Sequence, residues 1–175
     1  NTQIMFSKNG RVVYEALIKL KKKYRIKKIG FSVYDLNEAK FLIKKYNPEI
    51  LQVPINIFNR SFENLIKNNK MIIFQARSIF LQGQLLNPSK KLLKNKKIKK
   101  LFLKFNKTCE DLGISRSKAC IDFIKLNRNI NQIIFSVKNL DEFKAIKKAL
   151  AEKIVFKKKF KIDSNTSNIL DPRKW

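Results

Sequence analysis

The stretch 71–86 holds residues whose types and order indicate chemistry. An apolar, β-rich run begins at Met71 and ends at Ala76, and the polar residues Arg77 and Ser78 follow at once. A short run of this kind is typical of a buried strand. In parallel sheets, binding and catalytic groups lie where the strands end. We therefore expect a functional loop here, with Arg77 and Ser78 as its working residues.

The composition argues against several other kinds of site. The chain has no histidine and only two cysteines, so a zinc site is not expected. Cys109 and Cys120 fall at apolar positions of predicted helices. They are expected to be buried, reduced thiols, which indicates a cytoplasmic setting. The sequence contains neither a signal-peptide pattern nor an apolar run of about 18 residues, so no membrane association is expected.

The formal net charge of +27 is the most unusual feature of the composition. Such a charge is typical of proteins that bind nucleic acid or an anionic membrane. Lysines are nevertheless spread over most predicted helices, and arginine, which base readout and phosphate clamps favour, is rare. We interpret the charge as solvated helix faces. A basic nucleic-acid-binding module is the alternative, and it predicts binding with a steep salt dependence.

Four short strands are predicted to position the polar residues, at 28–32, 50–54, 71–76 and 132–136. The first three begin about 21 residues apart, the length of one strand–helix unit. Strands that alternate with helices pair in parallel through helical crossovers. The fourth strand comes later because two helices precede it.

Helices are predicted between and around these strands. Apolar residues at helical spacing indicate an amphipathic helix over 10–24. Asp35 with Glu38, and Asn139 with Glu142, have the spacing of capping boxes that open two further helices. The helix that Asn139 opens is expected to run through residue 150. Further helices are expected at 62–67, at 98–112, and from 115 or 117 to 124.

These strand–helix units describe an incomplete sheet. In an open sheet, Ile29 and Phe31 at one edge and Ile133 and Phe135 at the other would be left unpaired. Closure into an eight-stranded barrel would remove both edges, and four units are half of eight. The expected fold class is therefore α/β, as half of a barrel over residues 1–156, followed by a C-terminal tail over 157–175.

Several segments, in order, resemble the second half of an aldo/keto reductase, a (β/α)8 TIM barrel that reduces carbonyls with NAD(P)H. Residues 28–34 resemble the family's fifth-strand Gly-x-Ser-Asn motif, and residues 52–56 resemble its sixth-strand Gln-x-x-Tyr-Asn motif. Residues 76–83, Ala-Arg-Ser-Ile-Phe-Leu-Gln-Gly, are similar to the subgroup associated with bacterial surface-polysaccharide pathways. Residues 133–143 and the ending Asp-Pro-Arg-Lys-Trp are similar to the family's eighth strand, its following helix and its terminus. The resemblance implies the C-terminal half only, strands 5–8 with their helices.

The resemblance also implies a cofactor site. Ser32 and Gln52 would hold the nicotinamide carboxamide, which needs both a donor and an acceptor. Arg77 would stack on the nicotinamide, where many members of the family place an aromatic ring. The remaining contacts would come from Ser78 and the backbone of Ile79 and Phe80 at the pyrophosphate, and from Ser136 and Lys138 near the adenosine.

Each of the first three roles has a structural alternative. Gln52 could be a buried amide satisfied by neighbouring backbone, Ser32 a strand-end cap, and Arg77 part of a salt bridge. The sequence also departs from the family pattern, because Val33 replaces an Asn and Ile79 a common Pro. Glu142 stands where NADP-preferring members often carry an Arg, so the choice between NAD and NADP is open.

The family's catalytic Asp, Tyr, Lys and His lie on its first four strands, before the segments matched here. The chain begins with Asn1 rather than Met, and we expect an upstream half-barrel that carries these groups. The predicted function is that of a fragment of an NAD(P)H-dependent oxidoreductase, inactive alone because its general acid is absent. The intact enzyme would reduce an aldehyde or ketone, sugar-like by the subgroup resemblance. A noncatalytic protein that dimerises through its open strand edges is the other alternative.

Overall fold

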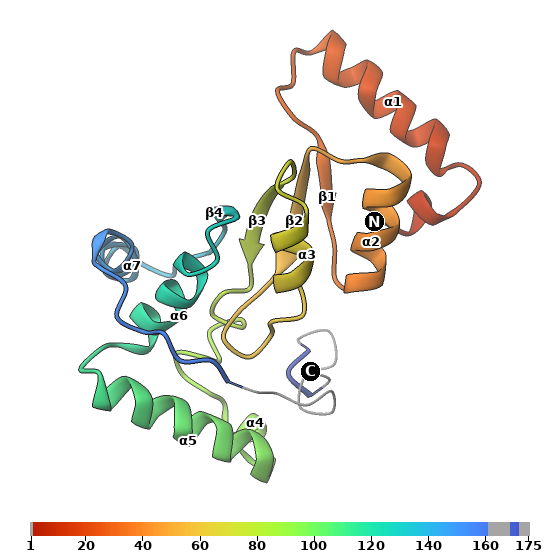
Figure 1. Cartoon of the computed structure of the whole chain (residues 1–175). Coiled ribbons are helices and arrows are strands. Elements are labelled where there is room, and N and C mark those ends of the chain that lie inside the picture. The colour runs from red at the N-terminus through yellow and green to blue at the C-terminus, as the bar shows by residue number, and fades with distance from the viewer. Residues whose placement is uncertain (1, 161–168, 172–175) are drawn as a thin grey trace.

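Four parallel strands form one sheet in the computed structural model, and their order in the sheet, β1-β2-β3-β4, is their order in the chain (Figure 1). The structure describes residues 2–160 and 169–171. The elements are η1 (Thr2–Phe6), α1 (Gly10–Lys23), β1 (Gly30–Ser32), α2 (Leu36–Tyr46), β2 (Ile50–Pro54), α3 (Glu63–Asn68), β3 (Ile73–Arg77), α4 (Lys90–Leu93), α5 (Lys96–Asp111), α6 (Arg116–Lys125), β4 (Ile130–Ile133) and α7 (Leu140–Ala151). This confirms an α/β fold with parallel strands joined through helices.

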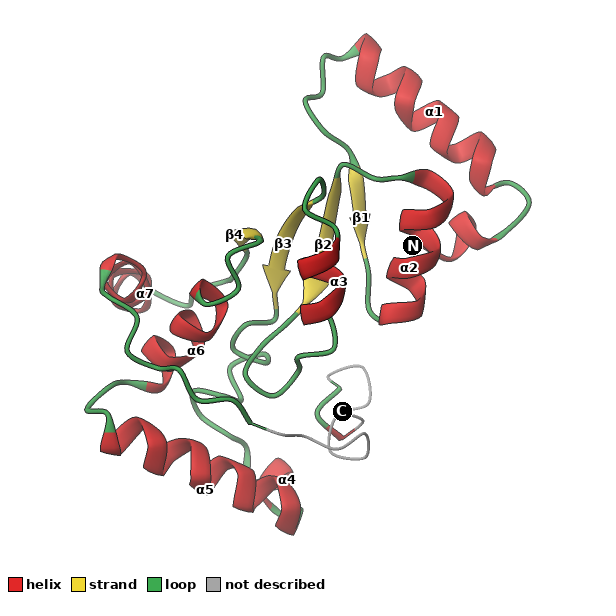
Figure 2. Ribbon diagram, viewed as in Figure 1, coloured by secondary structure: helices red, strands yellow, loops and turns green. Residues whose placement is uncertain are grey.

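The two faces of the sheet differ in what covers them. Phe31, Leu51 and Phe74 are buried, and they share one face because side chains alternate along a strand. Helices α2, α3 and α6 contribute buried side chains to the same core (Figure 2). The next residue along each strand, such as Ser32 after Phe31 and Gln52 after Leu51, points to the other face. These residues are only partly covered or exposed. The sheet is therefore covered by helices on one side and open on the other.

An aromatic cluster joins the segment after α7 to the loop after β2 and to α5. The rings of Phe58 and Phe102 lie 5.1 Å apart, edge to face, and Phe105 packs in the same way against Phe156 at 6.1 Å and Phe160 at 6.0 Å. Edge-to-face contacts of this kind add to the stability gained by burying the rings. The beginning of the predicted tail, 157–160, is thus held on the core through Phe160.

A buried ion pair fixes the same segment to α6. Lys118 donates a hydrogen bond to Asp122 one helical turn later and another, of 2.7 Å, to the carbonyl of Lys153. Asp122, with no exposed surface, accepts from the backbone N–H groups of Val155 at 2.9 Å and Phe156 at 3.0 Å. Both charges are therefore compensated, as buried charges must be.

The helix starts expected from the sequence are confirmed. The side chain of Asp35 accepts from the N–H of Glu38, and Asn139 accepts from the N–H of Glu142. Ser115, rather than Ser117, caps α6 by accepting from Lys118. Three side-chain caps thus set helix starts that local sequence already indicates.

Three predicted strands differ in their bounds from those in the structure. The first begins at Gly30 rather than at residue 28. The third begins at Ile73 rather than Met71, because a turn from Asn69 to Ile72 precedes it and leaves Met71 95% exposed. The fourth spans Ile130–Ile133 rather than 132–136. It pairs only with β3, which ends at Arg77, so the residues from Phe135 onward have no strand beside them. Ser136 therefore lies in the loop that follows β4.

Some predicted helix faces are less buried than expected, and two short elements were not predicted. In α1, Leu20 remains 44% exposed, and in α7 Leu140 and Phe143 are exposed. In α5, Phe102 is buried in place of the expected Leu101. Elements η1 and α4 are additional, because five- and four-residue helices leave little periodicity to detect.

The two cysteines are free and buried, as expected from the sequence. Burial raises the pKa of Cys109 to about 11 and also raises that of Cys120. In the described ranges 2–160 and 169–171, no helix is long and apolar enough to cross a membrane. The final residues of the Asp-Pro-Arg-Lys-Trp ending, 172–175, lie outside the described residues.

Candidate functional site

Four polar side chains form a ladder across the open face of the sheet. Ser32, Gln52, Gln75 and Gln132 occupy paired positions on β1, β2, β3 and β4. The Ser32 hydroxyl donates to Gln52 Oε1 at 3.2 Å, and Gln52 Nε2 donates to Gln75 Oε1 at 3.3 Å. The last step, from Gln75 Nε2 to Gln132 Oε1, measures 2.6 Å. One chain of hydrogen bonds therefore spans the sheet.

All hydrogen bonds of this ladder run in the same direction, and this fixes the orientation of each amide. Gln52 must point its carbonyl oxygen toward Ser32 and its NH2 group toward Gln75. A primary amide has two N–H donors and a carbonyl with two lone pairs, so one donor and one acceptor of Gln52 remain for a ligand. Gln52 is thus bonded to neighbouring side chains rather than to backbone, and it keeps the groups that a carboxamide would need.

Gln75 and Gln132 were not predicted as site residues. A bulge between β3 and β4 brings Gln132 opposite Gln75, and at the bulge the side chain of Asn131 accepts from the N–H of Phe74 at 2.9 Å. A polar residue at alternating positions of each strand was the only available signal. Its meaning depended on the pairing register, which long-range contacts determine.

Arg77 connects the ends of β1 and β3 across β2. Its guanidinium lies 4.4 Å from the centre of the Tyr34 ring and donates to the carbonyl of Val33 at 2.8 Å. It also lies 3.3 Å from the hydroxyl of Ser78. These contacts hold a flat cation in one orientation at the carboxyl edge of the sheet.

The loop after β3 has an unusual backbone. Ser78, Leu81 and Gln82 have positive φ angles of 56°, 49° and 51°, a region that L-residues other than Asn and Asp rarely adopt. Such strain persists only where the surroundings impose it, and it gathers at functional sites. The side chains of Ile79 and Phe80 are buried. Within residues 2–160 and 169–171, the backbone N–H groups of both donate to no acceptor.

Asn56 positions this loop from the neighbouring strand end. Its side chain is 1% exposed, and Nδ2 donates to the carbonyl of Ser78 at 3.1 Å. Its Oδ1 accepts from the N–H groups of Phe58 and Asn59, both at 2.9 Å. Asn56, the Asn of the motif at residues 52–56, therefore holds two loops together. Its position in the motif did not predict this role.

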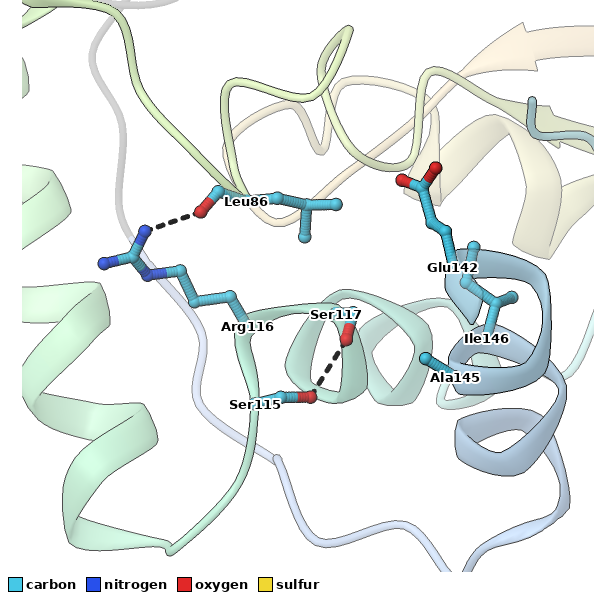
Figure 3. A pocket seen from close by; sticks show the side chains of 7 residues that line it. All are labelled: Leu86, Ser115, Arg116, Ser117, Glu142, Ala145 and Ile146. Carbon is cyan, nitrogen blue, oxygen red and sulfur yellow. Dashed lines mark hydrogen bonds between the residues drawn. The ribbon is translucent and has the colours of Figure 1, made fainter. Parts of the chain in front are cut away.

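A cavity of about 300 Å³ lies farther along the same edge, between the loop after β3 and the starts of α6 and α7 (Figure 3). Its lining comprises Leu86, Ser115, Arg116, Ser117, Glu142, Ala145 and Ile146. Arg116 donates to the carbonyl of Leu86 at 2.6 Å, and the hydroxyls of Ser115 and Ser117 lie 2.9 Å apart. Figure 3 shows Glu142 and Ser117 on two sides of the cavity, so it offers a carboxylate and hydroxyls to a ligand.

The predicted residues fall into two groups. Arg77 is in contact with Ser78, and Ser32 with Gln52, all on the sheet and at its carboxyl edge. Ser136 and Lys138 are exposed and are not brought to the ladder. Lys138 acts on the cavity indirectly, because its backbone N–H donates to Glu142 Oε2 at 2.7 Å. Glu142 therefore has the capping role expected from the sequence. The same hydrogen bond orients the Glu142 carboxylate, which also lines the cavity.

The described residues offer neither a metal cluster nor an activated tyrosine acid at α1. No group of three or more Cys, Asp or Glu side chains within the described ranges could hold a metal ion. Burial, together with the nearby charge of Glu49, raises the pKa of Tyr14. A phenol that serves as a general acid near neutral pH needs the opposite shift.

Comparison with known proteins identifies the family. The profile of the aldo/keto reductase family matches residues 8–164. The chain belongs to the aldo/keto reductase family. Members of this family generally use NAD(P)H. The expectation drawn from the motifs at β1, β2 and β3 is therefore confirmed at the level of the family.

Solved structures support the fold of this member of the aldo/keto reductase family. An aldo-keto reductase enzyme from a Medee basin deep-sea metagenome library is similar with a TM-score of 0.53 and 18% identity, over 93% of this chain and 54% of that chain. The glycerol dehydrogenase of Gluconobacter oxydans is similar with a TM-score of 0.53 and 16% identity, over 79% of this chain and 53% of that chain. The chain thus spans about half the length of both. A sequence comparison with curated proteins finds no match.

Proposed function

We propose that this chain is the cofactor-binding half of an NAD(P)H-dependent aldo/keto reductase and corresponds to strands 5–8 of a (β/α)8 barrel. The one-directional ladder from Ser32 to Gln132, on the open face of the sheet, is the observation that carries the proposal. A barrel has one face of its sheet covered by helices and the other turned inward. The coverage of a single face and the half-length match to solved relatives both support this assignment.

Ser32, Gln52 and Arg77 would hold the nicotinamide. Gln52 retains one donor and one acceptor, which matches the needs of a carboxamide. Arg77, fixed by Tyr34 and Val33, presents a flat cation on which an aromatic ring can stack. When bound, NAD(P)H supplies a hydride, and the residues of the ladder determine which face of the ring is presented.

The loop after β3 and the cavity would hold the rest of the cofactor. Ser78 and the N–H groups of Ile79 and Phe80 offer donors suited to a pyrophosphate. The cavity of about 300 Å³ would take the adenosine, and Ser136 and Lys138 would add further contacts to it. Glu142 would accept from a ribose 2′-hydroxyl and repel a 2′-phosphate, so we propose a preference for NAD over NADP.

The isolated chain is proposed to be inactive, because the groups that donate the proton are not among its residues. They would come from the other half of the barrel, which would pair with the free edges of β1 and β4. A groove of about 840 Å³ between η1, α1 and β1 is the proposed position of the adjoining strand, and Ile4 and Phe6 expose apolar surface beside it. The proposed substrate of the completed enzyme is an aldehyde or ketone, sugar-like by resemblance.

The proposal is tested by two assays on the purified chain. Titration with NADH and NADPH should show saturable binding, whereas incubation with glyceraldehyde or hexoses should give no oxidation above background. Turnover well above background would mean that a general acid within this chain has been overlooked. Sedimentation addresses the alternative of a dimer, because a second copy on the open edges would double the mass.

A further inference from the structure

A groove of about 640 Å³ lies between α3 and α6. Both helices lie on the side of the sheet opposite the open face (Figure 2). Its walls come from three separate parts of the chain: Glu63, Asn64, Ile66 and Lys67 of α3; Phe123, Leu126 and residues 127–129 at the end of α6; and Lys157, Lys158 and Lys159 after α7. The residues proposed to bind the cofactor do not contribute to it.

The lining carries a concentrated positive charge. Five side chains are cationic: Lys67, Arg128, Lys157, Lys158 and Lys159. The only carboxylate, Glu63, is already bound by Arg60, with a distance of 3.0 Å between Nε and Oε1. In the described part of the chain, none of the five cations has a hydrogen-bond or ion-pair partner. Their summed charge gives the groove a positive potential that attracts anions.

The backbone that presents these cations is held in place. Asn127 donates to the carbonyl of Phe123 at 3.0 Å and ties the turn to the end of α6. The buried carboxylate of Asp122 binds the backbone N–H groups just before Lys157, and the buried rings of Phe156 and Phe160 flank the three lysines. A ligand therefore has little backbone to order when it binds.

We propose that this groove binds an anion with several linked phosphate groups, such as inorganic polyphosphate or the backbone of a single-stranded nucleic acid. Lysine acts toward phosphate as a compact point charge, and five cations along one groove suit linked phosphates better than a single one. Phe123 lies buried in the wall rather than exposed for base stacking, so recognition would act through phosphates and not through bases. The groove volume is in the range of small-ligand pockets.

Calorimetric titration of the full chain with inorganic tripolyphosphate tests the proposal. The variant K157Q/K158Q/K159Q should weaken binding about tenfold through the loss of three surface charge contacts. The matched control K99Q/K100Q/K104Q removes the same charge from exposed positions of α5 and should change the affinity less than about twofold. Circular dichroism verifies that both variants fold.

Equal weakening in the two variants would show that net charge alone attracts the anion, and would overturn the proposal. Absence of tripolyphosphate binding at physiological salt would overturn it as well. Displacement of tripolyphosphate by NAD+ would place the anion in the cofactor site instead of the groove. A short oligouridylate distinguishes the two sources, because its competition with tripolyphosphate supports nucleic acid, and a failure to compete supports a free polyphosphate.

Discussion

The guanidinium of Arg77 lies over the Tyr34 ring, 4.4 Å from its centre, so two side chains from different strand ends stack on each other. The carbonyl of Val33, the residue before Tyr34, accepts a 2.8 Å hydrogen bond from the same guanidinium. The two contacts together hold Arg77 against the end of β1 rather than in solvent. Val33 stands where the family motif has Asn, and its backbone serves here as an acceptor.

Loss of the Tyr34 ring is expected to weaken cofactor binding. Tyr34→Leu removes a cation–π contact worth about 0.5–1 kcal/mol, so NADH affinity should fall about two- to fivefold. Tyr24→Leu is the control, because Tyr24 is also exposed and lies near a lysine, but at the C-terminal end of α1. Fluorescence titration with NADH measures both. Equal affinities for the Tyr34 variant and the wild-type chain would indicate that Arg77 does not contact the nicotinamide.

Gln75 is expected to act by positioning Gln52. Gln75→Leu removes the acceptor for Gln52 Nε2 and frees the amide to rotate, so cofactor affinity should fall about fivefold, equivalent to about 1 kcal/mol. Gln132→Leu, at the exposed end of the ladder, should have a smaller effect. The same titration measures both variants, and an equal loss in the two would argue against ordered positioning along the ladder.

Glu142 is expected to set the choice between NAD and NADP. Glu142→Gln removes the charge but keeps an acceptor for the capping hydrogen bond, so the helix start should persist. The affinity for NADP+ relative to NAD+ should rise about tenfold, as expected when one unfavourable charge pair is lost. Asp141→Asn removes a neighbouring charge of the same helix turn as a control. An unchanged ratio for the Glu142 variant would place the 2′-position away from this cavity.

Glu49 is expected to make stability depend on pH. Its carboxylate accepts two hydrogen bonds from Lys21, at 2.6 and 2.7 Å, and one from the N–H of Ile29, and these lower its pKa. Glu49→Gln should reduce the unfolding free energy at pH 7 by about 0.5–1 kcal/mol, because the pair is partly exposed and screened.

The sign of the pH effect follows from the lowered pKa of Glu49. The stabilisation is present above the ordinary pKa of a glutamate and is lost as the pH falls through the lowered value. Urea unfolding should therefore separate the wild-type chain from Glu49→Gln at pH 7, and the difference should shrink as the pH falls below the ordinary pKa of a glutamate. A difference that persists at the lower pH would mean that Glu49 acts through packing rather than charge.

Elements marked by local chemistry could be predicted from the sequence. Asp35 and Asn139 cap the helices that their spacing indicated, and β2 spans the predicted residues Ile50–Pro54. These signals lie within a few residues of one another, so they do not depend on the rest of the fold. The amphipathic helix α1 was predicted for the same reason.

Features that depend on distant pairing could not be predicted. The bulge opposite Phe74 brings Gln132 into the ladder, and only contact with β3 determines this register. The contact between Arg77 and Tyr34 and the groove at Lys157 join segments from separate parts of the chain. The motif resemblance predicted Ser32 and Gln52 as site residues. The hydrogen bond between them could not be predicted, because it depends on the pairing of their strands in the assembled sheet.

Titration of the purified chain with NADH, followed by nicotinamide fluorescence, tests the central claim most directly. We expect saturable binding of one cofactor per chain, weakened about tenfold in Gln52→Leu, which removes the donor and the acceptor proposed for the carboxamide. Asn68→Leu, at the exposed end of α3, removes an amide outside the ladder and should leave the affinity unchanged. Failure of NADH to saturate the wild-type chain, or equal binding by the Gln52 variant, would contradict the assignment of this sheet as the cofactor-binding half of the enzyme.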